Sequence, residues 1–342
     1  MSKVSIHLIT WNGEKYIEEC LNSILKQSFK DYLLLIIDNG SVDKTIKIIE
    51  EQFLPIFGDK LRFVKNKENL GFARAHNQAL LWTDTEYVLV LNQDVILEPN
   101  FLQEFVIFAD EHKEAGSFNA KVLRWEFEQI GDLKKSQKSD IIDSLGLKIF
   151  KSQRVIDIGA GEKDKNQYEA AEEIFGVSGS CSLYRRKVLA DVRYKDEFFD
   201  NDFFSYKEDV DLAYRLRWRG WKSFYVPQAV VYHKRSASSK EKKSVRQTIN
   251  LRKNKNKFIN YHSYKNHLFV LVKNLSLRNY FRYLLPIKFY EFKKFLYILF
   301  FERSTLAGLG EFFAKLKNIL AKRKFIMANR LVKDEEIRKW FN

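Results

Sequence analysis

The sequence predicts an α/β protein with a mostly parallel sheet flanked by helices, followed by a helical C-terminal extension. Three observations lead to this prediction. Short apolar segments alternate with helical patterns over residues 4–112. Those segments are apolar throughout, which is typical of parallel strands buried on both faces. After about residue 236 the sequence becomes rich in lysine, arginine and aromatic residues.

The first half of the chain supplies the clearest elements. Each expected strand is a short apolar run, and each expected helix has apolar residues three and four positions apart. The expected strands are Val4–Thr10, Tyr32–Ile37, Leu61–Val64 and Tyr87–Leu91. The expected helices are Tyr16–Leu25, Ile46–Phe53, Ala73–Trp82 and Pro99–His112.

The middle of the chain, roughly residues 116–200, is less regular. Further strands are expected at Val155–Ile158, Val177–Tyr184, Ser223–Val226 and Ala229–Tyr232, the last two separated by Pro227. Glu162–Glu173 is polar and predicts a surface loop. Asp209–Arg219 predicts a helix that ends at Gly220, a residue suited to a helix C-terminus.

The change in composition predicts two domains, residues 1–235 and residues 236–342. The second begins with a Lys-, Arg- and Ser-rich stretch, and aromatic clusters interrupted by lysines follow. Residues 258–301 are suited to a membrane interface, with basic residues near anionic headgroups. The alternative is a set of helices packed against the first domain with a solvated basic face.

Bulk composition limits the class of protein. The 342 residues are 45% apolar and 30% charged, so the chain is globular rather than disordered. The net charge of +15 favours anionic partners, such as a nucleotide, a nucleic acid or an anionic membrane face. Cys20 and Cys181 predict buried free thiols. No window has 18 uninterrupted apolar residues and no signal-peptide pattern is present, so the expected location is cytoplasmic.

Polar residues follow several expected strands, at the sheet edge where α/β proteins bind ligands. Asp94 comes after Tyr87–Leu91, and Asn92 points the same way in extended chain. Two such oxygen side chains can hold a divalent cation and a diphosphate. The alternative is a turn before Pro99, which an isolated Asn-x-Asp favours.

Two further strand ends are candidates for nucleotide binding. Asp38 can accept hydrogen bonds from a base or a ribose, or it can form an Asx turn with Asn39 and Gly40. Asn69 and Gly71 precede a helix whose N-terminus favours phosphate. An ordinary helix start explains them equally well, and the glycine spacing of a P-loop or dinucleotide fingerprint is absent.

Later in the chain, Glu208 and Asp209 open a helix. The helix dipole alone stabilises acids there; the functional alternative is a general base that deprotonates an acceptor hydroxyl. His233 ends the Ala229–Tyr232 strand. A lone histidine of this kind is usually structural, but it is also a common metal ligand.

Six segments in order resemble glycosyltransferase family 2, in particular bacterial rhamnosyltransferase-like members with the GT-A fold. They are VSIHLITWN at 4–12, LLIIDNGSVDKT at 34–45, NLGFARAHNQAL at 69–80, YVLVLNQDVIL at 87–97, GVSGSCSLYRRKVL at 176–189 and FFSYKEDVDLAYRLRWRGWK at 203–222. Their order and spacing fit over about residues 4–235, which is two thirds of the chain. Residues 1–235 are accordingly expected to be a GT-A catalytic domain.

The resemblance implies a role for each matching position. Asp38 would bind the nucleobase, Thr10, Trp11 and Asn12 would line the base and ribose pocket, and Asn69 and Gly71 would contact the nucleotide. Asn92-Gln93-Asp94 occupies the family's DXD position, with Asp94 as a ligand of Mg²⁺ or Mn²⁺ and His233 as a second ligand. Asp209 would be the catalytic base, supported by Glu208. Gly179 and Ser180 would border the sugar and the acceptor.

One position departs from the family pattern, because Asn92 stands where DXD has its first acid. The loss of one negative charge weakens the expected metal site. A neutral residue here is familiar among members proposed to use dTDP-sugars, so it hints at dTDP-rhamnose, with a UDP-sugar as the other donor.

The predicted function is inverting transfer of a sugar from a nucleoside diphosphate to a hydroxyl of a glycan or polyprenyl-linked glycan in cell-envelope polysaccharide synthesis. The expected location becomes the cytoplasm, with peripheral contact at the inner face of the membrane. A nucleic-acid-binding protein with a basic tail would leave the strand-end acids unexplained, so no nucleic-acid partner is expected. A nucleotidyltransferase would need a glycine-rich basic loop after the first strand. An inactive scaffold would have no need to retain Asp38, Asp94, Asp209 and His233.

Overall fold

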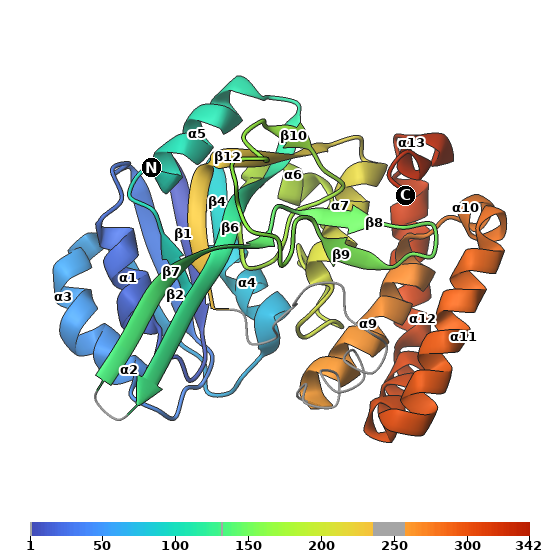
Figure 1. The fold of residues 1–342 in the computed structure, drawn as a ribbon, viewed down its shortest axis with the longest axis horizontal. Coiled ribbons are helices and arrows are strands. Elements are labelled where there is room, and N and C mark those ends of the chain that lie inside the picture. The colour runs from blue at the N-terminus through green and yellow to red at the C-terminus, as the bar shows by residue number, and fades with distance from the viewer. Residues whose placement is uncertain (1, 131–132, 235–256) are drawn as a thin grey trace.

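The computed structural model describes residues 2–130, 133–234 and 257–342. Figure 1 shows a central sheet with helices on both sides and a group of C-terminal helices next to it. The expected change of domain near residue 236 lies outside the described residues.

The main sheet has the strand order β10-β12-β6-β11-β4-β1-β2-β3, with β5 paired to β12 and β7 paired to β6. Its first four strands along the chain are parallel to one another: β1 (Val4–Thr10), β2 (Tyr32–Asp38), β3 (Leu61–Lys65) and β4 (Tyr87–Asn92). These strands confirm the expected parallel sheet, and their carboxyl ends meet at one edge. The strand β11 (Cys181–Arg185) is antiparallel to both its neighbours, so the whole sheet is mixed.

Helices cover both faces of this sheet. On one face, α1 (Ile17–Leu25) and α5 (Phe101–Glu111) pack against side chains such as Ile6 and Leu89, which are fully buried. On the other face lie α4 (Gly71–Trp82), α6 (Arg186–Asp191) and α7 (Glu208–Trp218). Both faces are buried over β1, β2 and β4, which explains why apolar residues predominate in these strands. Cys20 and Cys181 are buried free thiols in this core, as expected.

The segment expected to be helical at Ile46–Phe53 is helical, as α2 (Thr45–Ile48) and the π-helical turn η1 (Ile49–Phe53). The helical backbone continues through α3 (Leu54–Phe57), and the 3₁₀ turn η2 (Gly58–Lys60) follows. The helix expected after Asp209 ends as predicted, because Gly220 has a φ of +82°.

The middle of the chain is more regular than its sequence indicates. The long strands β6 (Ala115–Ile130) and β7 (Leu133–Ser144) form an antiparallel ribbon, and β8 (Leu147–Ile149) pairs with β9 (Val155–Asp157). The polar stretch before Ile174 is mostly loop and ends in the two-residue strand β10 (Glu172–Glu173).

Two expected strands differ from the prediction. Val177–Ser180 is a loop rather than part of β11, because two of its amides bond to side chains instead of a neighbouring strand: Ser178 to Asn119 and Gly179 to Asp209. The two strands expected around Pro227 are one strand, β12 (Lys222–His233). Its register shifts between Val226 and Val230, where proline cannot donate a ladder hydrogen bond.

The described part of the C-terminal region is helical, as expected. It consists of α9 (Lys257–Asn274), α10 (Leu277–Arg282), α11 (Leu284–Phe301), the 3₁₀ turn η3 (Arg303–Leu306), α12 (Ala307–Ala328) and α13 (Asp334–Arg338). Apolar residues of these helices, including Phe269 and Ile319, form one cluster with Tyr214 and Trp218 of α7. Among the described residues, no helix is both long and apolar enough to cross a membrane.

Candidate active site

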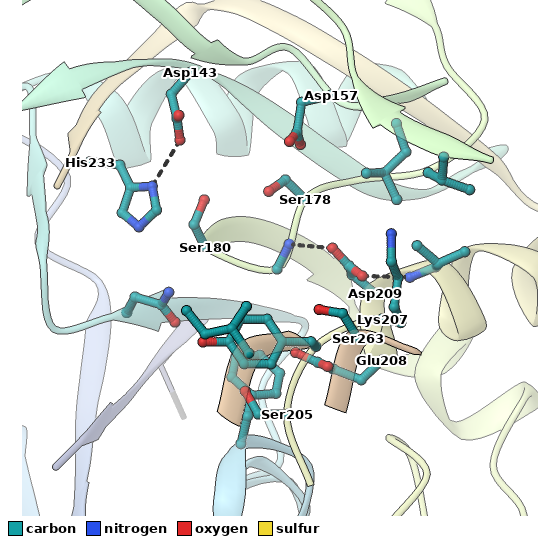
Figure 2. Close-up of a pocket in the computed structure, with 18 of the residues that line it drawn as sticks. Asp143, Asp157, Ser178, Ser180, Ser205, Lys207, Glu208, Asp209, His233 and Ser263 are labelled. Carbon is teal, nitrogen blue, oxygen red and sulfur yellow. Dashed lines mark hydrogen bonds and ion pairs between the residues drawn. The ribbon is translucent and has the colours of Figure 1, made fainter. Parts of the chain in front are cut away.

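A cavity of about 430 Å³ opens at the carboxyl end of β4, where it meets β9, β12, the start of α7 and α9. Figure 2 shows Asp143, Asp157 and His233 around one part of it and Glu208 and Asp209 around another. The structure brings seven of the residues singled out from sequence together here: Asn92, Asp94, Gly179, Ser180, Glu208, Asp209 and His233.

Asp94 and His233 meet because the strand after Asp94, β5 (Val95–Leu97), pairs antiparallel with the end of β12. His233 lies opposite Val95 in this register. Its Nε2 lies 3.5 Å from Oδ1 of Asp94. Two residues separated by 139 positions therefore face the same point of the cavity.

Asp143 orients the imidazole of His233 from the other side. Its Oδ2 lies 2.9 Å from Nδ1 of His233. Asp143 is the extra residue at a register shift between β6 and β7, since Val122 pairs with Ser144 and Leu123 with Ile142. A bulge of this kind re-aims a side chain, which brings this buried carboxylate to His233.

The two carboxylates keep His233 in its charged form. Burial of the imidazole opposes protonation, but Asp94 and Asp143 outweigh it and raise the pKa of His233 to about 10.

These residues fit a divalent cation, although they supply only part of a coordination shell. A hydrogen bond from Nδ1 of His233 to Asp143 leaves Nε2 as the ligand atom beside Asp94, an arrangement typical of histidine ligands. No group of three His, Cys, Asp or Glu residues suited to a metal occurs in the described ranges 2–130, 133–234 and 257–342. A metal here would take its remaining ligands from a diphosphate and from water.

Glu208 and Asp209 lie on the first turn of α7. Asp209 accepts hydrogen bonds from the amide of Gly179 through Oδ2 (3.2 Å) and from the amide of Val210 through Oδ1 (2.7 Å). Glu208 is buried, and its Oε2 has no hydrogen-bond partner within the described part of the chain.

Burial raises the pKa of both acids. For Glu208, the neighbouring charge of Asp209 raises it further. For Asp209, the positive charge of Lys207 and two backbone hydrogen bonds oppose the effect of burial only in part. A carboxylate with a raised pKa is a stronger base, so the environment of Asp209 favours proton abstraction.

Gly179 and Ser180 line the cavity between the two acids of α7 and the end of β4. A Cβ on Gly179 would lie 3.6 Å from Cβ of Asp209, so glycine leaves the acid accessible from this side. The hydroxyl of Ser180 is buried at the cavity, and no residue in the described ranges bonds to it. Such a group is available to a bound molecule.

The other predicted nucleotide-binding residues lie at the neighbouring strand ends and outside the lining of this cavity. Asp38 forms the Asx turn that its sequence allows. Its Oδ1 accepts from the amides of Gly40 and Ser41, which forms the Asx turn. Its Oδ2 is buried and has no hydrogen-bond partner among the residues that the structure describes.

Thr10, Trp11 and Asn12 form a loop tied to two neighbouring segments. Gln93 accepts from the Thr10 hydroxyl (2.5 Å) and the Trp11 amide (3.0 Å), so this loop is held to the Asn92–Asp94 turn. Asn12 accepts from the amide of Val42. The Trp11 side chain is half exposed and can offer its ring to a base.

Asn69 and Gly71 also have structural contacts. Oδ1 of Asn69 accepts from the Gly71 amide at 2.9 Å, as at an ordinary helix start. Gly71 has a φ of +81°, and a Cβ there would lie 2.6 Å from the carbonyl oxygen of Phe204. The close approach that this glycine permits is therefore to the segment before α7.

Sequence reasoning missed several residues of this site. Asp143, Asp157 and Lys207 line the cavity, and Gln93 links the two loops. An acid after Ile141-Ile142 was a usable signal for Asp143. Ile259 and Ser263 of α9 also line the cavity, although they belong to the region predicted to be a separate extension.

Comparison with known proteins gives a consistent family. A model described as "Glycosyl transferase family 2" matches residues 5–193, and one described as "Glycosyl transferase family group 2" matches residues 159–289. The N-acetylglucosaminyl-diphospho-decaprenol L-rhamnosyltransferase of Mycobacterium tuberculosis is 25% identical over 243 residues, covering 68% of this chain and 76% of that protein.

Other relatives match shorter parts. The poly(ribitol-phosphate) beta-N-acetylglucosaminyltransferase TarS of Staphylococcus aureus is 32% identical over 213 residues, covering 57% of this chain and 35% of TarS. The teichoic acid poly(glycerol phosphate) polymerase of Staphylococcus epidermidis is 36% identical over 94 residues, 28% of this chain and 13% of the polymerase. The chain matches less than half of the length of three curated relatives, namely 13%, 33% and 40%.

Solved structures share the fold. A crystal structure of S. aureus TarS 1-349 has a TM-score of 0.51 at 18% identity, covering 99% of this chain and 89% of that one. GalNAc-T7, solved with UDP, GalNAc and Mn²⁺, has a TM-score of 0.58 at 12% identity, covering 80% and 48%. Because the first family match takes in more than half of the sequence and the fold agrees, this chain belongs to glycosyltransferase family 2 and is a transferase with a GT-A fold.

Proposed function

We propose that the protein transfers a sugar from a nucleoside diphosphate to an acceptor hydroxyl with inversion, and that Asp209 is the general base. The observation that carries this proposal is the partly buried Asp209 carboxylate, which faces the same cavity as Asp94 and His233. Family membership supports the reaction class.

The chemistry follows from the residues that line the cavity. Asp209 takes the proton of the acceptor hydroxyl as its oxygen forms a bond to the anomeric carbon. The bond from that carbon to the diphosphate oxygen breaks on the opposite face, and the electron pair leaves with the nucleoside diphosphate. No covalent intermediate forms, so no nucleophilic side chain is required.

Asp94 and His233 are the proposed ligands of Mg²⁺ or Mn²⁺, which supplies positive charge for the leaving diphosphate when bound. Asp143 keeps Nε2 of His233 directed at this position. With Asn92 as the neutral partner, His233 shares the metal with Asp94.

Asp38, with Thr10, Trp11 and Asn12 beside it, is the proposed site of the nucleobase and ribose, and Asn69, Gly71 and Asn92 complete the donor side. The free Oδ2 of Asp38 suits an N–H donor on the base. Uracil and thymine both carry one, so UDP- and dTDP-sugars, including dTDP-rhamnose, are the proposed donors. Gly179 and Ser180 lie where the sugar and acceptor meet, and the proposed acceptor is a glycan or lipid-linked glycan of the cell envelope.

A panel of nucleotide sugars tests this assignment. Calorimetry with UDP- and dTDP-sugars, each with and without Mg²⁺ or Mn²⁺, should find a donor whose affinity rises about tenfold or more with metal. The same donor should release its nucleoside diphosphate when an acceptor is added. If no donor binds, or if metal changes no affinity, the proposed reaction or its metal site is wrong.

Helix α11 is the proposed contact with a membrane. Leu285, Phe289, Phe292 and Phe300 are 60–81% exposed and lie on one face of the helix, with the exposed Lys288 and Lys293 on either side of that face. Figure 1 places α11 at the edge of the molecule, away from the sheet. An apolar stripe between lysines is complementary to an anionic lipid surface.

Vesicle sedimentation tests this contact. The protein should bind vesicles of phosphatidylcholine with phosphatidylglycerol more tightly than vesicles of phosphatidylcholine alone. A Phe289→Ser, Phe292→Ser variant should lose about tenfold or more of that affinity, whereas Ile56→Ser, an exposed apolar residue on α3, should not. Equal binding by both variants would contradict the proposal, and a stable dimer in solution would show that a second copy covers the stripe.

A further inference from the structure

The segment 203–207, just before α7, has an unusual backbone. Phe204, Tyr206 and Lys207 have φ values of 62°, 71° and 71°, a region that side-chain-bearing residues rarely adopt. Such conformations persist only where the surroundings hold them, and they concentrate at functional sites. Ser205, Tyr206 and Lys207 line the cavity, and the chain continues directly into Glu208 and Asp209.

Asn266 of α9 holds this segment. Its side-chain amide nitrogen lies within hydrogen-bond distance of the carbonyl oxygens of Phe203 (2.8 Å), Ser205 (2.8 Å) and Tyr206 (2.7 Å), which share its two N–H donors. The carbonyl of Phe204 accepts instead from the amide of Ala73 on α4, at 3.2 Å. Four successive carbonyls are therefore bound, three of them by one fully buried side chain.

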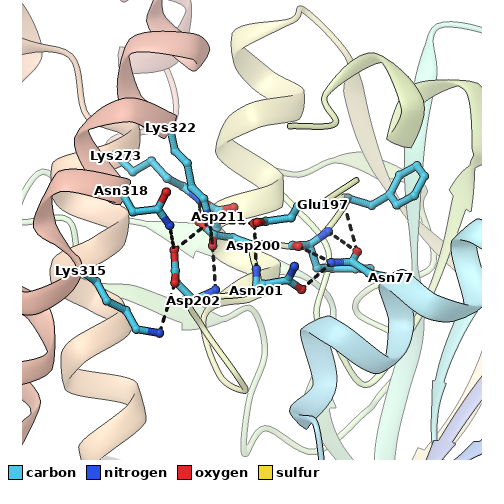
Figure 3. Close-up of polar contacts among 12 residues, drawn as sticks. Asn77, Glu197, Asp200, Asn201, Asp202, Asp211, Lys273, Lys315, Asn318 and Lys322 are labelled. Carbon is cyan, nitrogen blue, oxygen red and sulfur yellow. Dashed lines mark hydrogen bonds and ion pairs between the residues drawn. The ribbon is translucent and has the colours of Figure 1, made fainter. Parts of the chain in front are cut away.

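Ion pairs connect helix α9 to residues on both sides of segment 203–207. Lys273 pairs with Asp200 and Asp211, which come before and after residues 203–207 in the chain. Lys322 of α12 pairs with Asp200 and with Asp202. Figure 3 shows these pairs converging between the C-terminal helices and the segment that leads to α7. Asn266 thus bonds to the segment from a helix whose place is set by buried charges.

We propose that Asn266 is a positioning residue, which keeps segment 203–207 in its strained conformation so that Asp209 faces the acceptor. The C-terminal helix α9 is then part of the active site rather than an attachment to it. This inference rests on the proposed role of Asp209. Its structural half, that Asn266 holds segment 203–207, can be tested without measuring sugar transfer.

Asn279 on α10 is a matched control. It is also fully buried, its side-chain amide donates to the carbonyl oxygen of Asp334 at 3.1 Å, and its Oδ1, like that of Asn266, has no partner. It belongs to neither the cavity nor segment 203–207.

Hydrogen exchange on the full chain tests the structural half. Asn266→Ala should speed amide exchange over residues 203–210 by about tenfold or more, and Asn279→Ala should leave it within about twofold of the parent. Unchanged exchange in Asn266→Ala, or the same change in both variants, would overturn the proposal. If Asn266→Ala does not fold, Asn266→Ser, which retains one donor, takes its place and must speed exchange over residues 203–210 by more than about twofold for the proposal to stand.

Steady-state kinetics tests the catalytic half. Asn266→Ala should lower kcat by about tenfold or more with the donor KM within about twofold, since donor binding depends on other residues. Faster exchange with an unchanged kcat would show that the segment is held but does not position Asp209. If the parent transfers no sugar from any donor, the proposed function fails while the exchange result still decides what Asn266 holds.

Discussion

The proposed donor side and acceptor side of this site are built in different ways. The donor side consists of Thr10–Asn12, Asp38, Asn69 and Gly71, which lie at the ends of parallel strands and in the loops beside them. The acceptor side is the segment from Asp200 to Asp211, and its position depends on α9 and α12. The position of the donor side follows from the sheet, whereas the position of the acceptor side depends on helices in the last third of the chain.

The ionic contacts behind the acceptor side give the largest expected effect. The side chain of Lys322 is 3% exposed and pairs with Glu197, Asp200 and Asp202. Lys322→Met removes the lysine that Glu197, Asp200 and Asp202 share and leaves Asp200 with Lys273 and Asp202 with Lys315. The loss of this buried charge should cost about 3–5 kcal/mol of unfolding free energy in urea denaturation. Lys317→Met, an exposed lysine on the same helix, should cost less than about 0.5 kcal/mol. Equal stability of both variants would show that α12 does not support the acceptor side.

The same contacts predict a dependence on acid. Burial of Asp200 favours its neutral form, but Lys273 and Lys322 outweigh this and lower its pKa below the ordinary value of 3.8. A lowered carboxyl pKa contributes stability that is present above pH 3.8 and is lost as the pH falls through the folded-state pKa. Lys322→Met should therefore unfold at a higher pH than the parent in an acid titration.

On the donor side, Asp38→Asn should weaken binding of UDP or dTDP by about 1.5–3 kcal/mol, because the carboxylate is replaced by a neutral amide. Asp31→Asn changes an exposed acid just before the same strand and serves as the control in calorimetry. Stability should change little in Asp31→Asn. Equal nucleotide affinities in both variants would show that Asp38 does not bind the base.

Asp143→Asn should lower metal affinity by about 10–100-fold, since the side chain that orients His233 loses its charge. The exposed Asp140→Asn on the same strand is its control. Mn²⁺ titration in the presence of UDP measures both. An unchanged metal affinity in Asp143→Asn would contradict the assignment of His233 as a metal ligand.

The pKa of His233, about 10, predicts how metal binding depends on pH. Below that pH the imidazole carries a proton that a metal must displace, so affinity should rise by about tenfold per unit between roughly pH 7 and 8.5. The folding stability of the metal-free protein should change with pH in the opposite direction. The contribution of charged His233 to that stability is fully present below pH 6.5 and is lost as the pH rises through about 10. His233→Ala should abolish the slope in a Mg²⁺ titration.

The sequence predicted the sheet and its strand-end residues because apolar runs and short-range turns carry that information locally. Asp38 and Asp94 follow buried strands, and their positions at the sheet edge come from that alone. Asp143 was missed because its direction depends on a bulge between two strands. Asn266 was missed because one asparagine in a helix carries no sign of the three carbonyls it binds, which lie 60–63 residues earlier in the chain.

The same contrast bears on the division that composition predicts near residue 236, because residues beyond it contact the site. Lys265, Asn266 and Lys273 are buried on α9, whereas a helix that only packed on a core would bury apolar residues there. Each also contacts the segment from Asp200 to Asp211, although Lys265 forms its ion pair with Glu311 of α12. The basic C-terminal composition therefore includes buried charges that contact the catalytic part.

A comparison of Asp209→Asn with Asp94→Ala tests the central claim most directly, with donor affinity measured by calorimetry and sugar transfer measured on the same samples. Asp209→Asn should bind the donor within about twofold of the parent and lose about 10³-fold or more of kcat. Asp94→Ala should lose the metal-dependent part of donor affinity. Full transfer by Asp209→Asn, or donor affinity in Asp94→Ala that still responds to metal as in the parent, would contradict this account.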